Sequence, residues 1–237
     1  MLPIKDLNKT LTTPHVNRLL LISNILIFTI YSLSSQNIVF ENRFTNYFEN
    51  NFVMVPNEII HGQQLYTLFT SMFMHATWLH LLGNMLFLYV FGDNIEDVFG
   101  HAGYLIFYLI SGLAAAFAHI FTMLFAPTIS NLIGIAISSD LTDGIVGASG
   151  AISGVLGAYL ILYPKAQILT IVLYVIIPIP AILFLGFWFV MQWLYGAFDT
   201  LGGVAYFAHI GGFIAGMILA LAIGLRRKKA LKARFRL

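Results

Sequence analysis

Long apolar runs separated by short polar stretches dominate the chain. Runs of about 18 or more apolar residues are typical of transmembrane helices, in which the helix itself satisfies the backbone polar groups. The pattern therefore predicts an all-α, polytopic bundle forming a single membrane domain over residues 1–237, with its core at about 19–225. Six spans are expected, at approximately Leu19–Leu33, Trp78–Phe91, Ala102–Phe125, Ile145–Tyr163, Pro180–Leu194 and Val204–Leu225.

Two stretches between these spans break the pattern. Residues Ser34–His75 are semi-polar and rich in aromatic side chains, which is typical of a segment lying in the membrane interface. Residues Ile168–Pro180 are ambiguous, because a β-branched run there ends in the sequence Pro178-Ile179-Pro180. Two prolines would remove backbone donors from a helix, so the fifth span is expected to begin near Pro180, where proline in the first turn is tolerated.

Composition supports the membrane class. Hydrophobic residues make up 59% of the chain and charged residues only 9%, whereas soluble domains carry about 25% charged residues. There is no cysteine, which excludes disulfides, thiolate metal sites and a cysteine nucleophile. The N-terminal segment also lacks a signal-peptide pattern. Together these features favour a prokaryotic plasma membrane.

The distribution of Lys and Arg predicts the orientation. With six spans, the N-terminal segment, the loop containing Lys165 and the basic tail 226–237 share one side of the membrane, and they hold 11 of the 12 Lys and Arg residues. Only Arg43 falls on the other side. Because positive charge accumulates in cytosolic loops, both termini are expected in the cytosol. An odd number of spans would destroy this asymmetry.

A few polar side chains lie near the outer ends of the second, fourth and sixth spans. His80 and Asn84 are four residues apart and so share one helix face. Ser149 and His209 each lie a few residues inside their own spans, at a depth of roughly 6–8 Å. Polar groups within a span are costly and usually face an interior cavity. The orientation places all four at a similar depth.

This set of groups is suited to acyl transfer. The hydroxyl of Ser149 becomes a nucleophile when the imidazole of His209 takes its proton. The oxyanion that forms needs donors, which the Asn84 amide, the His80 ring and the Ser149 backbone N–H can supply. No Asp or Glu lies in a span near this depth, so a Ser149–His209 dyad is expected rather than a triad.

Each residue also has a structural interpretation. A lone His or Asn in a bundle commonly bonds between helices, and a Ser in a span commonly bonds the carbonyl four residues earlier. A metal site is disfavoured, because His75 and His80 are five apart and no HExxH motif occurs. The remaining histidines are interpreted as loop or packing residues: His15, His61, His101 and His119. The acidic stretch Asp93, Glu96 and Asp97 is interpreted as an interfacial end to the second span.

Small residues at three- and four-residue spacing mark the fourth and sixth spans. Such faces let two membrane helices approach closely, as a hydrogen bond between Ser149 and His209 requires. Simple helix packing explains the same pattern. The glycines are Gly147, Gly150, Gly154 and Gly157 in the fourth span and Gly211, Gly212 and Gly216 in the sixth.

The combined motifs resemble the rhomboid intramembrane serine proteases. They are His75 followed by His80-Leu-Leu-Gly-Asn84, then Gly147-Ala-Ser149-Gly, then Ala-His209-Ile-Gly-Gly212, in that order on the second, fourth and sixth spans. The resemblance covers roughly residues 62–224. It implies a six-helix bundle with a Ser149–His209 dyad, oxyanion-hole residues His80 and Asn84, and transmembrane proteins as substrates, cut near the extracellular end of a span.

The sequence departs from the family pattern in two places. Tyr66-Thr67 stands where many members have a Trp-Arg pair, and Ser153 stands where an aromatic often supports the catalytic histidine. The family's fifth helix is proposed as a lateral gate, and the Pro178-Ile-Pro180 entry is compatible with that. The main alternative is a non-proteolytic rhomboid-like protein that binds membrane clients. A channel or transporter is disfavoured, since no coordinating groups stand out near the midplane. No cofactor, metal or nucleic-acid partner is expected.

Overall fold

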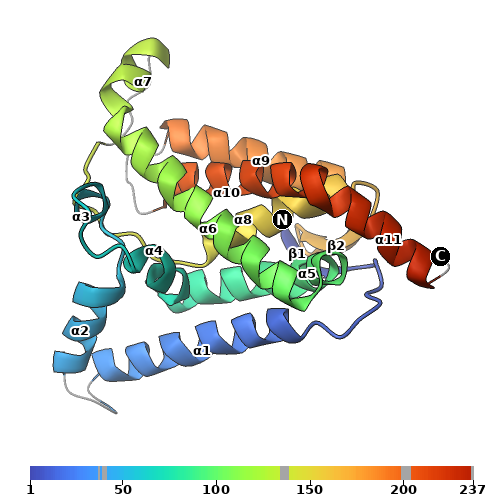
Figure 1. Ribbon diagram of the computed structural model, residues 1–237, viewed down its shortest axis with the longest axis horizontal. Coiled ribbons are helices and arrows are strands. Elements are labelled where there is room, and N and C mark those ends of the chain that lie inside the picture. The colour runs from blue at the N-terminus through green and yellow to red at the C-terminus, as the bar shows by residue number, and fades with distance from the viewer. Residues whose placement is uncertain (37, 39–41, 134–138, 199–203, 236–237) are drawn as a thin grey trace.

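The computed structural model describes residues 1–36, 38, 42–133, 139–198 and 204–235. Long helices run side by side along its longest axis (Figure 1). The last of them passes through a five-residue π-helical turn, Ala220–Gly224, and continues into the basic tail. The helices of the bundle are α1 (His15–Ser35), α5 (Trp78–Phe99), α6 (His101–Leu124), α8 (Ser149–Leu162), α9 (Ala181–Phe198), α10 (Tyr206–Leu219) and α11 (Leu225–Phe235).

Four helical stretches in the described residues are long and apolar enough to cross a membrane: His15–Ser35, His101–Leu124, Ala181–Phe198 and Tyr206–Phe235. The apolar helix α8 has only 14 residues, or about 21 Å at 1.5 Å per residue. Nearly all of its side chains are buried among its neighbours. The chain is thus a multi-pass membrane protein with a short helix at its centre, and the total of six spans stays a prediction.

The chain is mostly helical as predicted, but the all-α prediction missed a three-stranded antiparallel sheet. Its strands are β1 (Leu2–Asp6), β2 (Gln167–Val172) and β3 (Val175–Pro180), in the order β1-β2-β3. Leu2 pairs with Ile171, and Val172 pairs with Val175 across a two-residue turn. The β-branched run that made Ile168–Pro180 ambiguous favours this hairpin, and its prolines lie on an edge strand, where they are tolerated.

The segment predicted to lie in the interface folds into short helices at the opposite end of the bundle from the sheet (Figure 1). They are α2 (Asn42–Phe52), α3 (Pro56–Ile60), α4 (Thr67–Thr70) and a 3-10 turn, Ser71–Phe73. Helix α7 (Ala126–Ile133) extends α6 at the same end. Met54 pairs with Ile145 through backbone hydrogen bonds. These contacts hold the segment before α8 against the short helices.

Helices α8 and α10 approach each other so closely that only glycine fits at their crossing. A Cβ added to Gly212 would lie 2.1 Å from the carbonyl oxygen of Gly150, and one added to Gly216 would lie 1.9 Å from that of Gly154. On the other side of the pair, a Cβ on Gly157 would lie 2.0 Å from the carbonyl oxygen of Phe213. The close approach predicted from the glycine pattern is therefore confirmed.

The acidic residues predicted to end the second span lie within its helix and do not end that helix. Helix α5 continues to Phe99, with Glu96 and Asp97 buried. The Glu96 carboxylate accepts hydrogen bonds from the N–H groups of Val16 (2.9 Å) and Asn17 (2.7 Å). It thereby caps the first turn of α1. A carboxylate there compensates free N–H groups and the positive end of the helix dipole. Glu96 and Asp97 thus anchor the N-terminal segment, Asp97 through the N–H groups of Leu11 and Thr12, and their position relative to the membrane interface stays a prediction.

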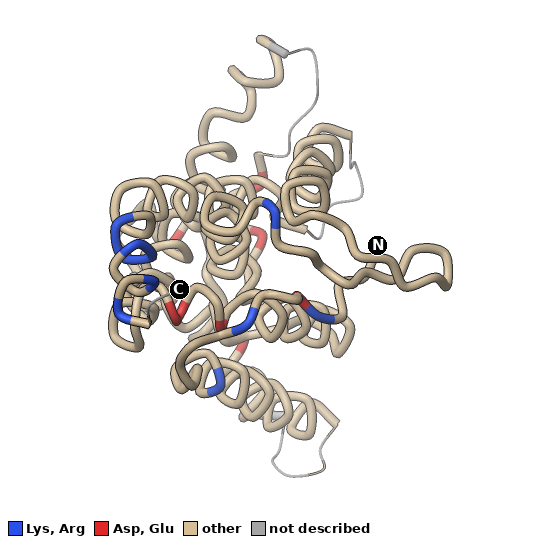
Figure 2. Tube along the Cα trace, turned by 90° about the vertical axis from the view of Figure 1, so that its right-hand side faces the viewer, with Lys and Arg blue, Asp and Glu red and all other residues tan. Residues whose placement is uncertain are grey.

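The N-terminal strand and the basic tail lie at the same end of the bundle. Asp6 accepts a hydrogen bond of 2.6 Å from the hydroxyl of Tyr159 near the end of α8, and burial raises the pKa of the Asp6 carboxyl. Lys228 donates to the carbonyl of Leu162, at the last residue of α8. Figure 2, which looks at this end, shows most of the Lys and Arg residues there. Arg236 lies outside the described residues.

Candidate active site

Ser149 lies at the sharp junction between an extended segment and α8. It is the first residue of the helix, not a position about one turn inside it, so the predicted start of the span at Ile145 was wrong. Gly147 explains the difference, because its φ of +129° is not helical and its N–H bonds the Ser71 carbonyl at 2.9 Å. The Ser149 hydroxyl is thereby presented at the N-terminal end of a buried helix.

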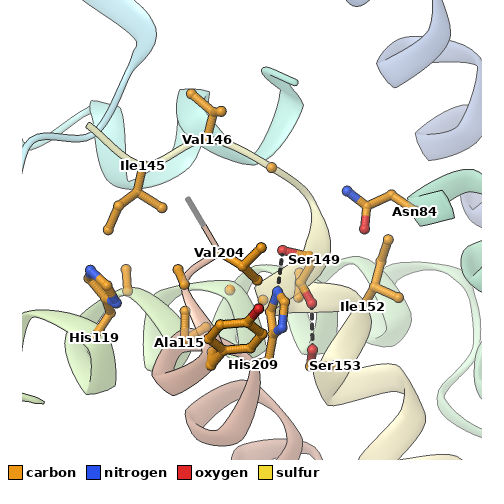
Figure 3. A pocket seen from close by; sticks show the side chains of 18 of the residues that line it. Asn84, Ala115, His119, Ile145, Val146, Ser149, Ile152, Ser153, Val204 and His209 are labelled. Carbon is orange, nitrogen blue, oxygen red and sulfur yellow. Dashed lines mark hydrogen bonds between the residues drawn. The ribbon is translucent and has the colours of Figure 1, made fainter. Parts of the chain in front are cut away.

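His209 lies in the first turn of α10 and contacts Ser149 directly. Its Nε2 is 2.8 Å from the Ser149 Oγ, a distance typical of a good hydrogen bond. The glycines at the crossing of α8 and α10 allow this contact, because the two backbones meet just below it. Figure 3 shows the imidazole and the hydroxyl facing each other. Two residues 60 positions apart in sequence are thus joined.

The other ring nitrogen of His209 contacts a residue that the sequence interpretation did not include. Its Nδ1 is 2.8 Å from the Oε1 of Gln192 on α9. Gln192 is buried, with 7% of its surface exposed. Its carbonyl oxygen can only accept, so Nδ1 carries the hydrogen and Nε2 is left free to accept from the serine. The site is a Ser–His–Gln chain rather than an isolated pair.

Aromatic support for the His209 ring comes from α9 and α10. The Trp188 ring, one helical turn before Gln192, lies 6.0 Å from the His209 ring between centroids, and the Tyr206 ring lies 6.4 Å away. Ser153, at the position where many family members have an aromatic, instead donates a 2.6 Å hydrogen bond to the Ser149 carbonyl. The missing aromatic on α8 is therefore replaced by side chains from neighbouring helices.

Asn84 and His80 both lie on the first two turns of α5, beside Ser149. Asn84 is 8% exposed, and its Nδ2 has no hydrogen-bond partner among the described residues. An unsatisfied buried donor is costly and marks a place where a ligand atom would bind. The His80 Nε2 lies 2.8 Å from where a Cβ on Gly147 would be, and the Ser149 Oγ lies 3.6 Å from the same point. His80 thus borders Ser149, and Asn84 lines the same cavity.

These side chains share one cavity of about 990 Å³, which Trp188 and Gln192 also line. Figure 3 shows Asn84 and His119 on opposite sides of the Ser149–His209 pair. His119 was interpreted as a packing residue, yet it lines this cavity and its ring nitrogens have no partner among the described residues. No cluster of three His, Asp or Glu side chains suited to a metal occurs in the described part of the chain.

The fold and the site define a multi-pass membrane protein in which a helix crossing joins a serine to a histidine inside a cavity. The matching family model is that of the Rhomboid domain, over residues 62–226. The chain therefore belongs to the rhomboid family, and the resemblance seen in the motifs is confirmed. The N-terminal strand and α1 lie outside the matched region.

Named relatives cover both eukaryotes and bacteria. RHOMBOID-like protein 1 of Arabidopsis thaliana is 32% identical over 168 residues, which are 71% of this chain and 37% of that protein. Rhomboid protein 1, mitochondrial, of Saccharomyces cerevisiae is 29% identical, over 69% of this chain and 44% of its own length. Rhomboid protease GluP of Bacillus subtilis is 32% identical, over 73% of this chain and 29% of its own length. The chain spans less than half the length of these relatives.

Proposed function

We propose that the chain is an intramembrane serine endopeptidase that cleaves transmembrane protein substrates. The observation that carries this proposal is the 2.8 Å contact between the Ser149 Oγ and the His209 Nε2. A non-proteolytic client-binding protein would have no need of a hydroxyl paired with an oriented imidazole. The relative named as a protease supports the same function.

In the first step, the Ser149 Oγ attacks the carbonyl carbon of the scissile peptide bond while His209 Nε2 takes the hydroxyl proton. The resulting imidazolium is held by Gln192, whose Oε1 accepts the Nδ1–H. The amide is neutral, so it fixes the tautomer and orientation of the ring without adding a charge to an apolar site. This is the orienting task that Asp performs in a soluble triad.

The oxyanion formed by the attack would lie between α5 and the start of α8. The Asn84 Nδ2, the His80 ring and the Ser149 backbone N–H are its proposed donors. As the first residue of α8, Ser149 has an N–H without a partner inside the helix, at the positive end of the helix dipole. Preorganised donors in a site of low dielectric stabilise developing charge strongly.

The tetrahedral intermediate then collapses, and His209 passes its proton to the leaving amine as the peptide C–N bond breaks. Water then attacks the remaining acyl ester and loses a proton to His209. As the ester C–O bond breaks, His209 returns this proton to the Ser149 Oγ, and the second product leaves as a carboxylic acid. The cavity of about 990 Å³ offers room for both the substrate backbone and this water. No cofactor is required by any step.

The proposed topology is six spans, with both termini in the cytosol of a prokaryotic cell and cleavage near the extracellular end of the substrate span. Two observations support it. The N-terminal strand and the basic tail meet at one end of the bundle, where the positive charge gathers. Ser149 lies at the N-terminal end of α8, whose other end carries those contacts. The site is therefore near the opposite surface.

A serine-directed covalent probe tests the proposed nucleophile. Detergent-purified protein incubated with a fluorophosphonate should gain the mass of one phosphonyl group on Ser149, located by peptide mapping. Ser149→Ala should remain unlabelled, whereas Ser153→Ala, which removes a neighbouring hydroxyl, should still react. Absence of labelling in the wild type, together with no cleavage of a single-span substrate, would favour the client-binding alternative.

Replacing Gln192 should weaken catalysis without removing it. Gln192→Met keeps the side-chain length but removes the acceptor for Nδ1–H, and we expect kcat to fall about 10- to 100-fold, the usual effect of removing a neutral partner that orients a functional histidine. The ¹⁵N chemical shifts of the His209 ring should show a smaller fraction of the Nδ1–H tautomer. The exposed Gln63→Met is the matched control. A lower kcat with an unchanged tautomer ratio would contradict the orienting role.

A further inference from the structure

The hairpin formed by β2 and β3 carries an apolar surface that the helical core does not use. Strand β3 and the turn before it read Leu-Tyr-Val-Ile-Ile-Pro-Ile-Pro over residues 173–180. No charged residue occurs between Lys165 and Phe198. The turn residues Leu173 and Tyr174 are 87% and 99% exposed, and Val175 and Ile176 are more than half exposed.

This exposure is found on both faces of the strand. Successive side chains of a strand point to opposite faces, so Val175 and Ile176 lie on different faces, and both are open. A sheet that faces water on one side alternates apolar and polar positions, but β3 contains no polar side chain at all. In water such an edge strand would be prone to aggregation.

The turn residues show the same preference for apolar side chains. Leu173 and Tyr174 have φ of 45° and 72°, the left-handed conformation that a two-residue hairpin turn requires and that Asn and Gly adopt most readily. Large side chains nevertheless occupy both positions, although the left-handed backbone is strained for them. An apolar tip is therefore a feature of the hairpin and not a consequence of its turn geometry.

The open edge of β3 is poor in hydrogen-bond donors. Val172 pairs with Val175 across the turn, so the N–H groups of residues 175, 177 and 179 point toward β2. The outward positions are 176, 178 and 180, of which Pro178 and Pro180 have no N–H. Only Ile176 keeps an outward donor. This edge is ill-suited to adding another strand, and it costs little to desolvate, although its outward carbonyls still require water.

The position of the hairpin matches the boundary of a bilayer. Figure 2 shows the sheet extending sideways beyond the helices, next to the N-terminus. Pro180 leads directly into α9, whose exposed residues include Ile182, Leu183 and Phe187. With 18 residues, α9 is about 27 Å long, close to the hydrocarbon thickness of about 30 Å. Its first residue, and the hairpin joined to it, therefore lie near the edge of the hydrocarbon region.

We propose that the β2–β3 hairpin is an interfacial membrane anchor, with its turn residues Leu173 and Tyr174 immersed in the acyl-headgroup boundary of the leaflet at the end of the bundle where the termini lie. The apolar side chains on both faces contact lipid, and the outward carbonyls of β3 reach interfacial water. Tyrosine is well suited to this depth, because its ring is apolar and its hydroxyl is polar. The lipid-facing surface of α9 thus continues onto the sheet.

Site-directed spin labelling of the full chain in nanodiscs tests this proposal, and the natural absence of cysteine allows single labels without further substitutions. Labels at Tyr174→Cys and Ile176→Cys are compared with a lipid reference, Phe187→Cys on α9, and a water reference, Lys229→Cys on α11. The measured quantity is the accessibility to oxygen, which concentrates in lipid, relative to a water-soluble nickel chelate.

We expect the oxygen-to-nickel ratio at Tyr174 and Ile176 to be several-fold above that at Lys229 and to approach, without reaching, that at Phe187. Unlabelled Tyr174→Ser protein should still assemble into nanodiscs as a folded protein, which controls for misfolding caused by a change at the tip. A ratio equal to that at Lys229 would overturn the proposal, because the hairpin would then lie in water. Low accessibility to both reagents would overturn it equally, since it would show contact with protein. Neither result depends on proteolytic activity.

Discussion

Ser149→Ala and His209→Ala are each expected to lower kcat for cleavage of a single-span substrate by at least about 10⁴-fold, because they remove the proposed nucleophile and the proposed base. Substrate affinity should change little, because both truncations leave the rest of the cavity lining in place to contact the substrate. The measurement is the initial rate of cleavage in reconstituted vesicles, with binding followed separately by the fluorescence of a labelled substrate.

The double variant is the sharper part of this prediction. The two side chains act as one unit through their 2.8 Å contact, so removing both should cost about as much as removing either one. Residual rates of the three variants should agree within about tenfold. Multiplicative losses would show that the two residues contribute independently, and cleavage that survives both changes would remove the basis of the proposed function.

Asn84→Ala is expected to lower kcat by about 10²- to 10³-fold, the usual effect of removing one oxyanion donor. Its Nδ2 has no partner in the described structure, so its truncation breaks no hydrogen bond of the resting protein. Thermal stability should therefore stay the same or rise slightly, while kcat falls and KM changes little. This opposition between stability and activity is the signature of a donor reserved for the transition state.

A matched control is available in another buried amide. Asn17 on α1 donates a 3.1 Å hydrogen bond to the Leu88 carbonyl and accepts one of 2.9 Å from the Tyr104 hydroxyl, and it does not line the cavity. Asn17→Ala should lower stability by about 1 kcal/mol or more, because a typical hydrogen bond contributes about that much, and leave kcat unchanged. If Asn84→Ala instead lowered the melting temperature and left kcat unchanged, Asn84 would be a packing residue.

The residues proposed for chemistry could be selected from sequence because the membrane makes polar groups rare. Within long apolar runs, Ser149, His209 and Asn84 were among the few side chains able to form hydrogen bonds, and helical spacing with charge counting assigned them a common depth. The close approach of their helices followed from the glycine spacing. What the pattern could not provide was the exact start of α8, which depends on a single non-helical glycine, Gly147.

Gln192 was missed although the same reasoning applied to it. It is the only strongly polar side chain in the apolar helix α9, and a single amide there should have raised the same question as Asn84. Soluble triads use Asp or Glu as the third catalytic member, and by that pattern an amide is not a candidate. In a site surrounded by apolar helices, a neutral acceptor avoids the cost of burying a charge.

The sheet could not be predicted because its sequence pattern is weak and its strands are far apart in sequence. The run Ile168–Ile177 favours a strand by its β-branched residues, but the same residues also fit a buried helix. Strand β1 carries no pattern of its own in five residues, and its partner β2 is far away in sequence. The roles of Glu96 and Asp97 depend on that same N-terminal segment, so they were interpreted as a simple end to a span.

The pairing of β1 with β2 has a consequence for how the protein is made. Leu2 pairs with Ile171, so the first strand leaves the ribosome long before its partner has been synthesised. Strands that are this far apart in sequence pair slowly. Strand β1 therefore stays unpaired until β2 has been synthesised. It must also remain on the same side of the bilayer as the α8–α9 connection. Completion of the sheet is therefore a late event in assembly, which follows the synthesis of α1, α5, α6 and α8.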